Sequence, residues 1–224
     1  MELNFKYKII KNLLSRDLCD FLFKYWLTQE KAVKYLLQTK QTYKHNIFIG
    51  TFELDEQVVG HYSKYGDWST DTILEDVRPK IEKELNLKLI STYSYTRVYR
   101  TGAELVRHID RKSCNISATL NLGGDMWPIF LDTTGSKNIV DSWYEKGQGA
   151  KVILKNNPTK GQSIELEKGD ALFYIGDKYE HWREPFTGNV CLQTFLHYNI
   201  DNQENRKNKF DGRPHLGVPR FQEE

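Results

Sequence analysis

A series of short β-type runs in the second half of the sequence constrains the fold more than any other feature. From Ile90 onward, segments rich in β-branched and aromatic residues alternate with Gly, Asn and Asp, a pattern typical of strands separated by turns. The runs are STYSYTRVYR, LVRHID, NISATLNL, PIFLD, AKVILK, QSIELE, DALFYIG and NVCLQTFLHY. So many short strands in one segment predict two sheets packed face to face, as in a double-stranded β-helix or jelly roll.

The first part of the sequence has helical periodicity instead. Ser15 is a good N-cap, and apolar residues at helical spacing predict a helix that reaches about Gln38. A second helix is expected after WSTD, with Pro79 as a kink or an early break. The predicted fold class is therefore mainly β with N-terminal helices (α+β), the helices packing on one sheet of the jelly roll.

No linker rich in Pro, Gly and Ser divides the chain, so we expect a single domain over residues 1–224. Residues 1–89 form mostly helical support, residues 90–199 the jelly-roll core, and residues 200–224 a C-terminal tail. The stretch TTGSKNIVDSWYEKGQG, residues 133–149, has little pattern and is predicted to be a loop at the mouth of the barrel. Loops of this length are usually functional or mobile.

The charge balance limits the expected binding partners, and the cysteine content indicates the redox compartment. Lys and Arg total 32 against 30 Asp and Glu, so nucleic acid is an unlikely partner, although a local patch around RKNKFDGR could contact phosphate. The cysteines Cys19, Cys114 and Cys191 form no CxxC pair, and the N-terminus lacks the pattern of a leader peptide. No apolar run approaches the roughly 18 residues of a membrane span. We expect a reduced cytoplasmic protein without a membrane contact, and the oligomeric state stays open.

The motif RHIDRK contains a candidate metal-binding pair. On a strand, His108 and Asp110 point to the same face, so an imidazole and a carboxylate lie side by side. An isolated HxD is more often polar surface, and a site needs a third ligand, which His181 in KYEHWREPF supplies. Two histidines and one carboxylate on one face of a metal suit non-haem Fe(II), because the opposite positions remain open. The other histidines (His45, His61, His197 and His215) match no ligand position, and ordinary polar or packing roles are expected for them.

Over roughly residues 90–199, the sequence resembles the 2-oxoglutarate and Fe(II)-dependent dioxygenases, specifically the prolyl 4-hydroxylase-like branch. The resemblance is carried by YRTGAELVRHID, SATLNLGGDMWPIFLD and KGDALFYIGDKYEHWREPFTGNVCLQTFLHY, and by the gap of about 70 residues between HxD and the second histidine. It implies that His108, Asp110 and His181 are catalytic iron ligands. It also implies Fe(II) as cofactor, with 2-oxoglutarate and dioxygen as co-substrates and succinate and carbon dioxide as products.

The sequence departs from the family at the cation that holds the distal carboxylate of 2-oxoglutarate. The family usually has Lys or Arg about nine or ten residues after the second histidine, and this chain has Val190 and Cys191 there. Arg183 is the best replacement, because its i+2 spacing from His181 directs it to the same interior face. Its alternative role is a surface arginine paired with Glu180 or Glu184. Arg97 is the second candidate.

Two more cofactor contacts carry over by resemblance. Tyr99 matches a tyrosine that contacts 2-oxoglutarate, and Asn121 matches a position that reaches its distal carboxylate; Gln193 is a weaker candidate of the same kind. Each residue has an alternative role. For Tyr99 it is packing inside the sandwich, and for Asn121 it is a hydrogen bond to a backbone group at a strand end. In SATLNL, apolar residues alternate with polar ones, which predicts a strand between helices and a wet pocket.

The predicted function is a 2-oxoglutarate- and Fe(II)-dependent hydroxylase acting on an unactivated carbon. The branch resemblance favours a prolyl or other peptidyl side chain, whereas a free amino acid or another small-molecule substrate fits the modest size equally well. Two further alternatives stay open. One is a non-catalytic jelly-roll binding module, supported by the missing cation at positions 190 and 191. The other is a cupin-like metal enzyme that uses no keto acid.

Overall fold

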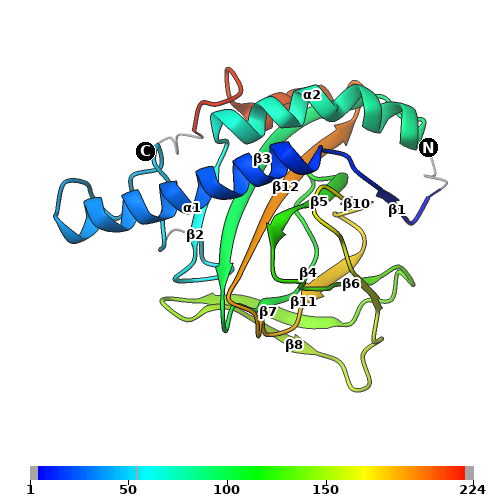
Figure 1. Cartoon of the computed structure of the whole chain (residues 1–224). Helices are drawn as coiled ribbons and strands as arrows, with labels where there is room; N and C mark the ends of the chain where they lie inside the picture. The colour runs from blue at the N-terminus through cyan, green and yellow to red at the C-terminus, as the bar shows by residue number, and fades with distance from the viewer. Residues whose placement is uncertain (1–4, 54, 220–224) are drawn as a thin grey trace.

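The computed structural model describes residues 5–53 and 55–219, and two facing β-sheets form its centre. The larger, six-stranded sheet has the order β1 (Tyr7–Ile10), β10 (Ala171–Tyr174), β5 (Ile116–Gly124), β12 (Val190–Ile200), β3 (Leu89–Arg100) and β2 (Tyr62–Tyr65). The smaller sheet has the order β4 (Leu105–His108), β11 (Glu180–Arg183), β6 (Ile129–Asp132) and β9 (Gln162–Ile164). Neighbouring strands are antiparallel throughout. This is the predicted mainly β jelly roll (Figure 1).

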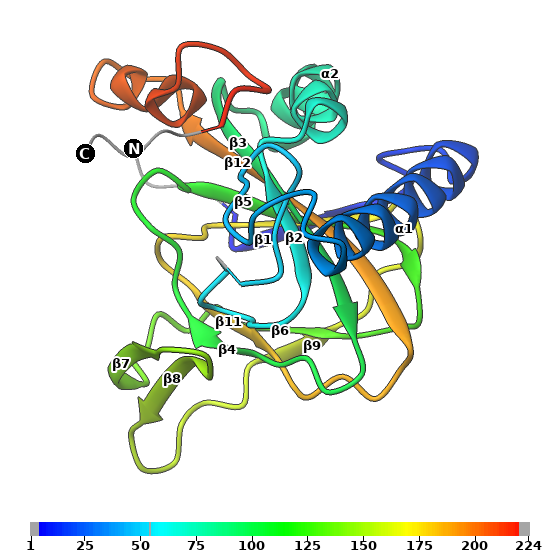
Figure 2. The ribbon, with the colours of Figure 1, turned by 90° about the vertical axis from the view of Figure 1, so that its left-hand side faces the viewer.

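The helices α1 (Arg16–Gln38) and α2 (Trp68–Leu85) lie over the larger sheet, on the side away from the smaller one (Figures 1 and 2). The predicted cap of α1 is confirmed, since Ser15 Oγ accepts a hydrogen bond from Leu18 N at 3.3 Å. Buried residues of both helices, such as Trp26 and Leu74, share one core with the apolar face of β5. The alternation in SATLNL therefore separates a helix-facing side from an interior polar side, as predicted.

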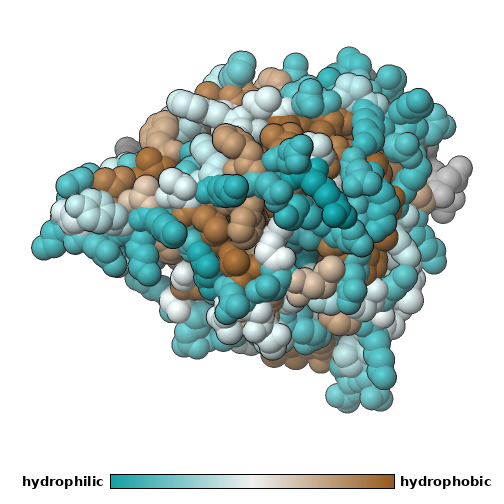
Figure 3. Space-filling view, viewed as in Figure 1, coloured by the Kyte–Doolittle hydropathy of each residue, from teal (hydrophilic) through white to brown (hydrophobic). Residues whose placement is uncertain are grey.

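The surface above this core is mostly hydrophilic, with smaller apolar patches between the polar side chains (Figure 3). On the outer side of α1, Leu18 is 41% exposed and Phe21 is 64% exposed. Leu22 and Trp26 form the buried side of this helix.

The start of α2 differs from the prediction, and the helix does not break early at Pro79. The helix begins at Trp68, because Asp67 caps it by accepting from Ser69 N at 2.8 Å. It then continues through Pro79 to Leu85 without ending there. A proline inside a helix removes one hydrogen bond and costs about 3 kcal/mol. Burial of Val77 and Ile81 on either side of Pro79, in the main core, offsets this cost.

The stretch predicted to be a loop contains most of a β-hairpin, so that prediction was wrong. Strand β7 (Ile139–Glu145) pairs with β8 (Gly149–Leu154) outside the two sheets. Nearly all of β7 is exposed, so its residues lack the alternation that reveals a half-buried strand. Strands β1 and β2 were not predicted either. The tail contains the 3-10 helix η1 (Asn205–Gly212), where Asp211 accepts from Tyr65 OH at 2.7 Å. Among the described residues, no helix is long and apolar enough to cross a membrane.

Candidate metal centre

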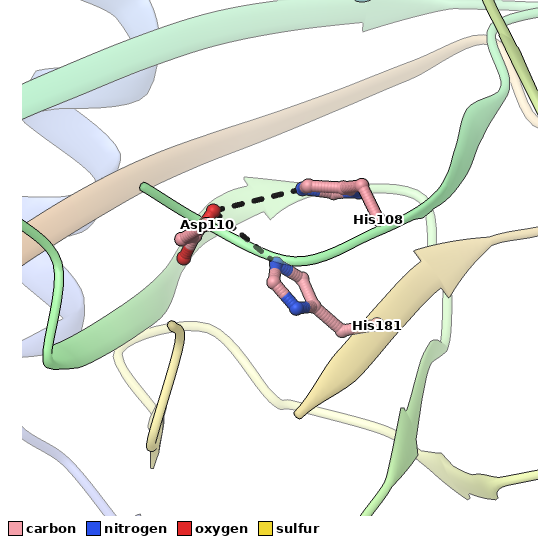
Figure 4. Close-up of side chains that lie close together, drawn as sticks. All are labelled: His108, Asp110 and His181. Atoms are coloured by element: carbon pink, nitrogen blue, oxygen red, sulfur yellow. Dashed lines mark ion pairs between the residues drawn. The ribbon is translucent and has the colours of Figure 1, made fainter. Parts of the chain in front are cut away.

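Two neighbouring strands of the smaller sheet, β4 and β11, bring the three predicted metal ligands together. His108 and His181 are directly opposite each other in the antiparallel register of these strands. Asp110 lies just beyond β4, where its backbone N–H donates to Gly176 O at 2.9 Å. The Asp110 carboxylate points towards the two imidazoles (Figure 4), so residues about 70 positions apart in the sequence share one site.

The side chains converge closely (Figure 4). Asp110 Oδ1 lies 3.7 Å from His108 Nε2 and 3.6 Å from His181 Nε2. One ligand atom from each residue lies within 4.8 Å of the others. Such spacing suits donors that surround a single small ion, and the set of two imidazoles and one carboxylate is the one expected for non-haem Fe(II).

Backbone contacts select the tautomer of both histidines. His108 Nδ1 lies 2.8 Å from Val106 O, and His181 Nδ1 lies 2.9 Å from Tyr179 O. A carbonyl oxygen only accepts, so each Nδ1 carries the proton and donates it. Each Nε2 therefore presents a lone pair to the site. A metal-bound histidine commonly has its second nitrogen fixed in this way, so the three residues fit a metal ion.

The charge states also fit. Burial lowers the pKa of His108 to about 4, with a further contribution from His181, so its imidazole is neutral at neutral pH. Burial acts to raise the pKa of Asp110, but the facing His181, with His197 and His108, brings it below its ordinary value. A neutral imidazole and an ionised carboxylate are the forms that bind metal.

The trio opens into a cavity of about 890 Å³. Hairpin residues Trp143, Tyr144 and Lys151 and the segment 55–57 form part of its wall, so the stretch we expected at the barrel mouth does border the site. Its aromatic lining consists of Tyr65, Tyr93, Tyr95, Trp143, Tyr144, Tyr174 and Phe195.

Arg183 is buried between the two sheets. Only 1% of its surface is exposed, and its Nη2 donates to Thr119 Oγ1 at 3.2 Å and to Gln193 Oε1 at 3.3 Å. Nη1 donates to the Trp127 carbonyl oxygen, and the buried Nε has no hydrogen-bond partner in the part of the chain that the structure describes. Across residues 5–53 and 55–219, Arg183 forms no ion pair with a carboxylate. Burial lowers its pKa, because the charged form is costly away from water.

The alternative pairing of Arg183 with a neighbouring glutamate does not occur. Glu180 accepts from Arg107 Nε at 2.7 Å, and Glu184 accepts from Trp182 Nε1 at 3.0 Å. Arg183 therefore remains a buried cation whose charge no described acidic group balances.

Arg97, the second candidate, is already neutralised. Its Nη2 forms a buried ion pair with Asp55, and its Nη1 donates to Tyr99 OH at 2.7 Å. Asp55 also accepts from Tyr95 OH at 2.7 Å. Sequence reasoning missed Asp55, because its segment has neither periodicity nor a motif.

The remaining predicted cofactor contacts lie in the same interior. Tyr99 is fully buried and packs edge-on against Trp127 at 4.7 Å between ring centres. Asn121 Nδ2 donates to Leu166 O at 2.7 Å, which is the backbone role considered as its alternative. Gln193 Oε1 accepts from Thr119 Oγ1 at 3.0 Å. Tyr99, Asn121 and Arg183 do not line the cavity of the metal trio, so their contacts with 2-oxoglutarate stay predictions.

Comparisons with known proteins agree on the fold. The chain is similar in structure to AviO1 from Streptomyces viridochromogenes Tue57, with a TM-score of 0.56 and 12% identity over 88% of this chain and 90% of that one. It is also similar to the non-heme alpha-ketoglutarate-dependent carbocyclase SnoK from nogalamycin biosynthesis (TM-score 0.53, 11% identity, 97% and 89% covered). A third similar structure is the viral collagen prolyl hydroxylase vCPH from Paramecium bursaria Chlorella virus-1 in its 2-oxoglutarate complex (TM-score 0.50, 11% identity, 88% and 98% covered).

No protein-family model matches the chain, and no curated protein matches it by sequence. The structural likeness nevertheless defines the fold: the chain has the jelly roll of the 2-oxoglutarate- and Fe(II)-dependent oxygenases, including a prolyl hydroxylase.

Proposed function

We propose that this chain is a 2-oxoglutarate- and Fe(II)-dependent dioxygenase that hydroxylates an unactivated carbon. The observation that carries the proposal is the convergence of His108 Nε2, His181 Nε2 and Asp110 Oδ1 in a cavity of the oxygenase fold. His108, Asp110 and His181 would hold Fe(II) on one face. When iron and 2-oxoglutarate are bound, they activate dioxygen for C–H hydroxylation with release of succinate and carbon dioxide. The chain supplies the ligand geometry and limits the access of water.

Arg183 supports a dicarboxylate co-substrate. A fully buried guanidinium is unfavourable without an anion, and a carboxylate that reaches it would form a charge-assisted hydrogen bond. The distal carboxylate of 2-oxoglutarate is such an anion. In this proposal Arg183 replaces the family cation that positions 190 and 191 lack, while Tyr99 and Asn121 remain the other proposed contacts.

The substrate is proposed at the level of its class. A prolyl or other peptidyl side chain follows from the prolyl 4-hydroxylase-like resemblance, and vCPH is by its name a collagen prolyl hydroxylase. A small metabolite is the second candidate, because a cavity of about 890 Å³ lies within the usual range of small-molecule sites. SnoK, described as a carbocyclase from nogalamycin biosynthesis, has the same fold. The three cysteines are buried and unpaired, which supports the expected reducing, cytoplasmic setting.

The decisive experiment is spectroscopic. Fe(II) and then 2-oxoglutarate are added to the protein without oxygen, and the visible charge-transfer band of a ferrous keto-acid chelate is recorded. The band should appear in the wild type and be absent in Asp110→Ala. Iron binding without the band would contradict the proposal and favour a cupin-like enzyme, and no iron binding would favour a binding module. Peptides, amino acids and metabolites are then screened by mass for a gain of one oxygen.

A further inference from the structure

The two oxygens of Asp110 have different surroundings. Oδ1 faces both imidazoles, at 3.7 and 3.6 Å from their Nε2 atoms (Figure 4). Oδ2 points away from them and accepts a hydrogen bond of 2.5 Å from Ser117 Oγ. Ser117 belongs to the interior polar side of β5 and is fully buried. The carboxylate is thus held so that a single oxygen is presented to the metal site.

Ser117 has a second partner on the neighbouring strand. Its Oγ lies 3.1 Å from Nδ1 of His197, the residue opposite it in the register of β5 and β12. A serine hydroxyl has one proton, and an ionised carboxylate can only accept. Ser117 therefore donates to Asp110 and accepts from the Nδ1–H of His197. The carbonyl oxygen of Cys114 lies farther away, at 3.5 Å.

His197 is itself fixed in place. It is 6% exposed, and the Tyr93 ring packs on it at 4.4 Å between ring centres. Burial lowers the pKa of His197 to about 4, so the imidazole is neutral and has one N–H. Because this proton is on Nδ1, Nε2 has none, and it makes no hydrogen bond among the described residues.

The chain also leaves no space beside this arrangement. A Cβ at Gly176 would collide with Ser117 Oγ and with Asp110 Oδ2. Gly176 O accepts from the backbone N–H of Asp110, so the glycine holds the backbone of Asp110 while its missing side chain leaves room for the carboxylate.

We propose that Ser117 and His197 are positioning residues that form a relay, His197 Nδ1–H to Ser117 Oγ–H to Asp110 Oδ2, which orients Asp110 for metal binding. The proposal rests on the proposed function and adds two residues to it. The sequence assigned neither of them such a role. The relay restricts Asp110 to one ligand oxygen, and the second oxygen then does not occupy a position that co-substrates need.

The affinity for a metal ion tests the relay, and this measurement does not need catalytic turnover. Mn(II) binding to the purified protein is titrated by the loss of the free-ion electron paramagnetic resonance signal. Ser117→Ala should weaken binding by about 10- to 100-fold, the effect typical of losing an outer contact to a metal ligand. His197→Phe should weaken it by on the order of 3- to 10-fold, as expected for one neutral hydrogen bond. Ser91→Ala is the matched control, because Ser91 is also a buried serine of the larger sheet but its hydroxyl has no hydrogen-bond partner among the described residues. It should bind Mn(II) as the wild type does.

Two substitutions at His197 test the direction of the hydrogen bond. The amide nitrogen of Asn is as far from Cβ as Nδ1 of His, whereas that of Gln reaches about as far as Nε2. His197→Asn should therefore restore most of the affinity lost in His197→Phe, and His197→Gln should not. In the double variant Ser117→Ala/His197→Phe, the loss should equal that of Ser117→Ala alone, because His197 acts through Ser117.

The outcomes separate this inference from the proposed function. If the wild type binds no Mn(II) or Fe(II), both fail. If the wild type binds and Ser117→Ala binds equally well, the relay is refuted while the metal site stands. Additive losses in the double variant, or equal rescue by Gln and Asn, would likewise refute it. Thermal melting of each variant verifies that a loss of affinity does not come from unfolding.

Discussion

Replacing Arg183 by glutamine removes the buried positive charge and keeps a polar group that can reach the same neighbours. Arg183 is 1% exposed and has no carboxylate partner among the described residues. Its positive charge should therefore act mainly in the binding of an anionic ligand and should add little to the stability of the fold. If that ligand is the distal carboxylate of 2-oxoglutarate, Arg183→Gln should weaken its binding far more than it destabilises the fold.

The expected size follows from general energetics. A hydrogen bond to a charged group contributes about 1.5–3 kcal/mol, so the dissociation constant should rise by roughly 10- to 150-fold. At a 2-oxoglutarate concentration about 100 times the wild-type dissociation constant, binding stabilises the protein by about 2.7 kcal/mol. For a chain of this size, that raises Tm by roughly 5–11 °C. With binding about 30-fold weaker, the same concentration contributes about 0.9 kcal/mol, or roughly 2–3 °C.

The assay is thermal unfolding of the Mn(II)-loaded protein without oxygen, with and without 2-oxoglutarate. Arg97→Gln is the matched control, because Arg97 is also buried but is paired with Asp55. It should lower Tm by leaving Asp55 unpaired, and it should keep the full shift on adding 2-oxoglutarate.

A keto acid without the distal carboxylate provides a second control. 2-Oxobutyrate keeps both groups that chelate a metal, so the wild type should prefer 2-oxoglutarate and Arg183→Gln should show little preference. A full thermal shift in Arg183→Gln, or its loss in Arg97→Gln alone, would refute the assignment of Arg183.

Three further predictions concern the surroundings of the site. Gly176→Ala should weaken Mn(II) binding at least tenfold, because the added methyl group collides with the Asp110 carboxylate; unchanged binding in the same titration would contradict the packing described. Arg107→Met should lower the free energy of unfolding in urea by about 3–5 kcal/mol, because Glu180 and Asp132 lose their shared buried cation; a loss below about 1 kcal/mol would show that water already compensates them. Stability should also fall on acidification: burial alone raises the pKa of Glu180, but bonds from Asn138 and Arg107 bring it below its ordinary value. The contribution of ionised Glu180 to stability is therefore complete above the unfolded pKa of about 4.3 and is lost as pH falls through the folded pKa. Urea unfolding at pH 7, 5 and 3 should show that the free energy of unfolding declines below about pH 5. A free energy of unfolding that does not change with pH would exclude this contribution.

Local patterns were sufficient for the elements that have a clear period or cap. The helix after Ser15 and the interior side of SATLNL follow from spacing alone, because burial on one face demands it. The hairpin β7–β8 and the continuation of α2 through Pro79 do not follow from spacing. An exposed strand has no required alternation, and core packing around Pro79 outweighs one lost hydrogen bond. The three candidate ligands were found by residue type and order, and the structure brings them within 4.8 Å of one another.

The sequence by itself thus determined the mainly β organisation and the three residues suited to bind metal. Periodicity is a property of neighbouring residues, and ligand chemistry is a property of the residue type. Only the tertiary structure decided which charged groups neutralise one another. The sequence places Arg183 ahead of Arg97 only through its spacing from His181, whereas folding brings Asp55 to Arg97 and leaves Arg183 with neutral partners. Ser117 and His197 become neighbours of Asp110 only when β5 and β12 pair. Charge balance and relay contacts depend on distances between residues far apart in the chain, and those distances exist only in the folded state.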